Sequence, residues 1–184
     1  LKAIEMVSKI IVKAYQDPKD MLAKGEMLLA ATFAGFGFGN AGVHLPHGMS
    51  YPVAGRVKEF LPKDYPSGHS MVPHGMSVIL NAPAVFRFTA PSNPKRHLHA
   101  AKLLGANIDG ANLEDSGEIL ADAIISLIKK IGIPNGLSEV GYNNKDIDDL
   151  VEGTMPQQRV LGLSPRTVNK EDIRNIFMDS MTLW

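Results

Sequence analysis

Two histidines of this sequence stand in matching surroundings. His47 and His74 each lie between a proline and a glycine, in Pro-His-Gly-Met runs at 46–49 and 73–76. Imidazole is the commonest side chain that binds zinc and iron near neutral pH. Proline suits the first turn of a helix and glycine permits close approach, so both histidines are predicted at helix starts, where two rings can converge on one ion. A lone histidine is more often a buried or capping residue, and the residues alone leave both interpretations open.

Five neighbouring side chains could contact a substrate: His44, Tyr51, Arg56, Lys58 and Lys63. His44 could line a pocket or replace a metal ligand, although a packing role is the simpler interpretation. The three cations lie in the first part of the segment that connects the two histidines. If both histidines held one metal, both ends of this segment would lie near that metal. A cation there could hold a substrate carboxylate through charge-assisted hydrogen bonds. The alternative is that all three are solvated surface charges.

Gly37, Gly39 and Gly42 satisfy the dinucleotide pattern G-x-G-x-x-G. That pattern binds phosphate only where a strand precedes it and a helix follows. The residues before Gly37 have helical spacing instead. We therefore interpret these glycines as a site of close helix packing beside the histidines, and predict no cofactor-binding residue in the chain.

The elements that position these residues are predicted to be helices. Apolar residues recur at helical spacing through most of the sequence, and no segment alternates like a strand. Pro83 should bend or divide the apolar stretch 73–86. Asn144 and Asn169 are predicted caps of the last two helices. The sequence predicts an all-α helical bundle forming one domain over 1–184, with helices at 4–14, 18–33, 47–57, 94–103, 114–131, 144–150 and 169–181.

Composition narrows the classes of partner. Of 184 residues 45% are hydrophobic, which is enough for a sizeable core, and 19 basic residues balance 19 acidic ones. Nothing in that balance favours binding to nucleic acid or to an anionic membrane. The absence of cysteine removes disulfides and thiolate metal sites. Because Leu1 is not an initiator methionine and already reads as helix interior, we expect the chain to be part of a longer protein.

The two histidine runs carry a resemblance. The small-residue stretch leading into His47, with Pro52 and Gly55 after it, and the later run around His74 resemble the iron-containing alcohol dehydrogenase family. The stretch 38–52 (Phe-Gly-Asn-Ala-Gly-Val-His-Leu-Pro-His-Gly-Met-Ser-Tyr-Pro) is similar to the branch that transfers hydride between hydroxy acids and oxo acids. So are three shorter segments, 63–65 (Lys-Asp-Tyr), 141–142 (Gly-Tyr) and 153–157 (Gly-Thr-Met-Pro-Gln).

The resemblance implies a C-terminal helical domain that holds a divalent metal, iron or zinc. His47 and His74 fall on the last two metal ligands of the family, while an aspartate and another histidine would precede Leu1. The family commonly has a histidine four residues after the first of these ligands, where this sequence has Tyr51, so no acid–base role is assigned to Tyr51. NAD(P) would be bound mainly by an N-terminal nucleotide-binding domain absent from this chain.

The implied reaction is hydride transfer through the nicotinamide from 4-hydroxybutyrate to 2-oxoglutarate, with the metal polarising the substrate oxygen. The resemblance also implies a mitochondrial location and a possible homodimer, and the chain alone is expected to have no redox activity. Two alternatives remain. One is an NAD(P)-dependent iron-type alcohol dehydrogenase with free cofactor exchange, and the other is a non-catalytic helical module that binds only a metal or a partner.

Overall fold

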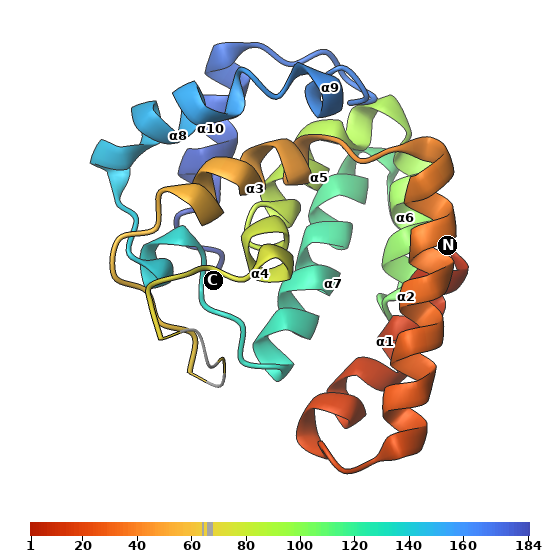
Figure 1. Ribbon diagram of the computed structural model, residues 1–184. Helices are drawn as coiled ribbons and strands as arrows, with labels where there is room; N and C mark the ends of the chain where they lie inside the picture. Colours follow the sequence, from red (N-terminus) through yellow and green to blue (C-terminus); the bar gives the residue numbers. More distant parts are fainter. Residues whose placement is uncertain (64, 66–67) are drawn as a thin grey trace. The chain divides into compact units, whose positions relative to one another are not determined.

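The computed structural model describes residues 1–63, 65 and 68–184, and within these ranges it contains helices and no strand (Figure 1). The prediction of an all-helical chain is confirmed. Asp64, which belongs to the resemblance at 63–65, lies outside the described residues. The described chain forms two compact units, residues 1–42 with 90–133 and residues 43–89 with 134–184.

The first unit consists of four α-helices and two short 3₁₀ turns. Helix α1 (Lys2–Gln16) packs on α2 (Met21–Ala41), and α6 (Pro94–Leu103) packs on α7 (Ser116–Lys130) and on α1. The 3₁₀ turns η1 (Ala90–Ser92) and η2 (Leu113–Asp115) precede α6 and α7. Helix α7 buries Leu120, Ile124 and Ile128 at helical spacing and ends before Gly132, as its sequence predicts.

The second unit carries every candidate site residue. Helix α3 (Leu45–Gly55) packs on α4 (His74–Ile79), α8 (Ile147–Thr154) and α9 (Gln158–Leu161), and α10 (Lys170–Asp179) packs on α8 and on α5 (Ala82–Thr89). The 3₁₀ turns η3 (Leu137–Val140) and η4 (Asn144–Asp146) lead into α8. The core of the second unit centres on the fully buried side chains of Leu45, Met49, Val53, Leu150 and Phe177.

Some predicted helix ends are correct and others are wrong; α2, for example, continues to Ala41 instead of ending at 33. Asn169 caps α10, and the break between α4 and α5 falls just before Pro83, as predicted. Helix α2 begins at Met21 rather than at Pro18, because the Asp20 side chain accepts a hydrogen bond from the backbone of Ala23 and caps the helix there. Asn143, rather than the predicted Asn144, caps the 3₁₀ turn η4 that leads into α8, and it forms a reciprocal capping box with Asp146.

The glycines of the G-x-G-x-x-G segment are not packing positions within this chain. Gly37 and Gly39 lie inside α2, and a Cβ added to either would meet nothing within 4 Å. Gly42 ends the helix with a φ of 75°. The expectation of close helix packing there is therefore wrong for the described residues, because this part of α2 is exposed. Its exposed apolar side chains include Phe36 and Phe38.

No single helix in the described ranges is long and apolar enough to cross a membrane, although α2 and α3 would pass that test if they were taken together.

Candidate metal centre

The imidazoles of His47 and His74 lie beside each other in the second unit. Their ring centroids are 5.4 Å apart, and the ring planes are inclined by 58°. His47 lies in the first turn of α3 and is partly buried, while His74 begins α4 and is exposed. Burial lowers the pKa of His47, and the neighbouring His74 lowers it further. The neutral form, which carries a free lone pair on nitrogen, is thereby favoured.

The same local structure presents both rings. The Ser50 hydroxyl donates to the carbonyl of His47 at 2.7 Å, and the Ser77 hydroxyl donates to the carbonyl of His74 at 2.8 Å. Both serines are buried. The repeated run is thus Pro-His-Gly-Met-Ser, and its serine bonds to the histidine carbonyl in the first turn of each helix.

Gly48 allows a close contact next to His47. A Cβ at this position would lie 3.0 Å from the Cδ2 atom of Leu161 and 3.2 Å from the Cγ2 atom of Val160. Both of those side chains belong to α9 and are buried. The glycine therefore lets α9 pack against the helical turn that carries the histidine.

The distance between the two rings suits a shared ion. With the nitrogen of each imidazole about 2.0–2.1 Å from a tetrahedral zinc, the centroids of two rings on one ion would lie roughly 5 Å apart. The described residues contain no group of three or more histidine, aspartate or glutamate side chains arranged to hold a metal. The pair thus fits part of a ligand set, and further ligands would have to come from other residues.

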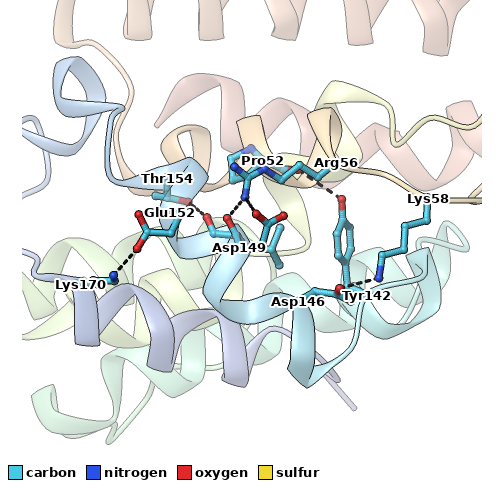
Figure 2. A network of polar contacts seen from close by, with 10 residues as sticks. Pro52, Arg56, Lys58, Tyr142, Asp146, Asp149, Glu152, Thr154 and Lys170 are labelled. Atoms are coloured by element: carbon cyan, nitrogen blue, oxygen red, sulfur yellow. Dashed lines mark hydrogen bonds and ion pairs between the residues drawn. The ribbon is translucent and has the colours of Figure 1, made fainter.

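Two of the candidate substrate cations already have acidic partners (Figure 2). A guanidinium nitrogen of Arg56 lies 2.5 Å from the Asp149 carboxylate and also donates to the backbone carbonyl of that residue. The Lys58 ammonium lies 2.6 Å from the Asp146 carboxylate and lowers the pKa of that group. The third cation, Lys63, is exposed and forms no ion pair with the rest of the described chain.

The other two candidates lie in α3 or at its start. His44 is the residue before α3, and its carbonyl accepts the backbone N–H groups of His47 and Gly48 at 2.9 and 3.1 Å. Its side chain is partly buried. Tyr51 is 40% exposed, one turn after His47. The local structure therefore gives His44 a part in starting the helix, and it leaves the Tyr51 side chain partly exposed.

The sequence assigned no role to Tyr142, whose side chain bonds to the backbone of α3. The Tyr142 side chain is 4% exposed, and its hydroxyl donates to the Val53 carbonyl at 2.7 Å. Burial raises the pKa of Tyr142 to about 12, and the nearby carboxylate of Asp146 adds to the shift. The Gly141-Tyr142 pair entered the sequence prediction only through the family resemblance, because no local pattern around it predicts a contact with α3.

Comparison with known proteins identifies the family. The model for the family described as "Fe-containing alcohol dehydrogenase family, C-terminal" matches residues 1–181. This chain belongs to that family. It is 50% identical over 182 residues to a protein named hydroxyacid-oxoacid transhydrogenase, mitochondrial, from Xenopus tropicalis, covering 99% of this chain and 39% of the relative. It is 48% identical over 185 residues to a probable mitochondrial hydroxyacid-oxoacid transhydrogenase from Dictyostelium discoideum, covering 100% of this chain and 34% of the relative.

The structural comparison agrees with the family assignment. The alcohol dehydrogenase from Oenococcus oeni superposes on this chain with a TM-score of 0.85 and 25% sequence identity, covering 97% of this chain and 43% of that structure. The fold is therefore that of the C-terminal part of iron-type alcohol dehydrogenases. The chain spans about a third to two fifths of the length of the curated relatives it matches.

Proposed function

We propose that, in the whole protein, His47 and His74 hold a divalent metal at the active site of a hydroxyacid–oxoacid transhydrogenase. The observation that carries the proposal is the 5.4 Å separation of the two imidazoles, which suits one shared ion. Family membership supports a metal, and the relatives at about half identity are named for this activity. Iron and zinc both accept nitrogen ligands, so either metal is consistent with the two imidazoles.

Each part of the site has a distinct task in this proposal. His47 and His74 donate nitrogen lone pairs to the metal, and Ser50 and Ser77 fix the turns that carry their rings. The bound metal would supply Lewis acidity toward the substrate oxygen. NAD(P) would carry the hydride, and it would be bound mainly by residues beyond this chain.

The substrates in this proposal are hydroxy acids and oxo acids. The hydride of 4-hydroxybutyrate passes through the nicotinamide to 2-oxoglutarate, so that succinic semialdehyde and 2-hydroxyglutarate form in equal amounts. A cation near the metal would hold the substrate carboxylate. Lys63 suits this task better than Arg56 or Lys58, since those two would have to release a carboxylate first. His44 and Tyr51 remain candidates to line the pocket.

The whole protein is also proposed to be mitochondrial, because the names of both relatives carry that location. Assembly as a homodimer is part of the same proposal, and size-exclusion chromatography with light scattering would test it.

Product analysis of the whole protein tests the activity. The enzyme is incubated with 4-hydroxybutyrate and 2-oxoglutarate without added nucleotide, and both products are measured. Equal formation of succinic semialdehyde and 2-hydroxyglutarate supports transhydrogenation through a retained cofactor. Turnover that requires added NAD⁺ or NADP⁺ and proceeds equally well with simple alcohols would instead favour an alcohol dehydrogenase with free cofactor exchange.

A further inference from the structure

We infer that Tyr142 is a positioning residue for His47: its buried hydroxyl fixes the C-terminal end of α3 and thereby the place of the imidazole in the first turn of that helix. The inference rests on the proposed metal site, since its consequence is a change in metal binding. The Tyr142 hydroxyl itself donates to the backbone of α3.

Helix α3 needs support from outside because its own hydrogen bonding is interrupted. Pro52 lies within the helix and has no N–H to donate to the carbonyl of Gly48, the residue next to His47. The Val53 carbonyl belongs to the last turn, where acceptors have no partner inside the helix. Val53 is fully buried, so water does not replace the missing donor there.

The Tyr142 hydroxyl donates to the Val53 carbonyl, and the backbone next to Tyr142 holds the side chain in place for this bond. Gly141 ends the 3₁₀ turn η3 with a φ of 95°, a backbone conformation that favours glycine. The backbone N–H of Tyr142 then bonds to the carbonyl of Leu137 at 3.1 Å. From this position the phenol reaches the Val53 carbonyl at 2.7 Å and approaches the Pro52 carbonyl at 3.4 Å (Figure 2).

The ion pairs near this end of α3 are weaker constraints. Arg56 pairs with Asp149 and Lys58 pairs with Asp146, but the Asp149 side chain is 66% exposed and the Lys58 side chain is 51% exposed. Exposed ion pairs contribute little because water and salt screen them. The hydroxyl of Tyr142 is thus a buried polar connection between the segment that follows η3 and the helix that carries His47.

The test compares Tyr142→Phe with Tyr15→Phe in the whole protein. Both variants lose only a hydroxyl, and Tyr15 is an exposed residue of α1 in the other unit. The dissociation constant for Zn²⁺ is measured by chelator competition, and the visible absorption of the Co²⁺-loaded protein reports the coordination geometry. Thermal unfolding of the metal-free protein measures stability separately. For Tyr142→Phe we expect a dissociation constant higher by up to about 10-fold and a changed Co²⁺ spectrum. This is the lower end of the loss on removing a group bonded directly to a metal ligand, because Tyr142 acts through the backbone of α3.

The outcomes separate this inference from the proposed function. Wild-type affinity and an unchanged Co²⁺ spectrum in Tyr142→Phe would overturn the positioning role, even if the melting temperature falls. Equal changes in Tyr15→Phe would overturn it as well. If His74→Ala binds metal as tightly as the wild type does, the proposed metal site itself fails, whatever the tyrosine variants show.

Discussion

Replacing Gly153 with alanine tests how closely α8 packs on α3, the helix of His47. An added Cβ would lie 2.7 Å from the Cβ of Pro52 and 3.1 Å from the Cζ of Arg56. The first of these neighbours belongs to a rigid ring attached to the backbone, so it cannot rotate away. One of the two helices has to move, and overpacking of this kind costs about 1–3 kcal/mol.

Alanine also favours the helix, and this gain has to be subtracted. Gly153 is the penultimate residue of α8, and in a helix interior alanine is better than glycine by about 1 kcal/mol. The net expectation is a loss of up to about 2 kcal/mol in the free energy of unfolding, which lowers the melting temperature of a chain this size by up to about 8 °C.

The matched control is Gly55→Ala. Gly55 ends α3, and an added Cβ there would meet nothing within 4 Å. Its melting temperature should stay unchanged or rise slightly. Calorimetry of the two variants side by side gives the comparison. If Gly153→Ala is as stable as the control, the close approach of α8 to Pro52 does not exist in solution and the reasoning about α3 loses one of its supports.

Three further predictions follow from the same contacts. Gly136 has a φ of 81°, and an added Cβ would lie 2.5 Å from the Met181 carbonyl oxygen. Gly136→Ala should therefore lower the free energy of unfolding, measured by urea titration, by about 3 kcal/mol through backbone strain and this clash. Wild-type stability would refute this. Because the pKa of Tyr142 is raised to about 12, its contribution to stability is complete below about pH 10 and is lost between about pH 10 and 12, so the alkaline fall in stability should be smaller in Tyr142→Phe. In the whole protein Lys63→Ala should lower kcat/KM for 4-hydroxybutyrate about 10-fold and hardly affect a neutral alcohol of similar length; equal losses on both substrates would remove the assigned role.

The sequence predicts the helices of this chain well because their signals are local. Ile124 and Ile128 recur at the spacing of one buried face, and Asn169 caps a helix through its own side chain. The start of α2 was misplaced because Pro18 and the true cap, Asp20, are both acceptable starting signals. Only the geometry of the formed turn distinguishes them.

The candidate site was predictable in its types of residue and not in its contacts. The repeated Pro-His-Gly-Met runs allow two convergent histidines without requiring them, and the rings do lie beside each other. Nothing local could show that Arg56 and Lys58 pair with carboxylates almost 100 residues later, with sequence separations of 93 and 88 in their hydrogen bonds. The contact of Tyr142 with α3, also across about 90 residues, was hidden for the same reason. Such long-range pairs depend on how helices pack, which the pattern of one segment does not contain.

Metal analysis of the purified whole protein tests the central claim most directly. The metal content per chain is measured for the wild type, for His47→Ala, for His74→Ala and for the control His99→Ala, whose exposed histidine lies in α6. Removing one ligand from a site of three or four should release most of the metal. The account predicts a metal bound to the wild type and the control and largely lost from both site variants. Full occupancy in either site variant would contradict it.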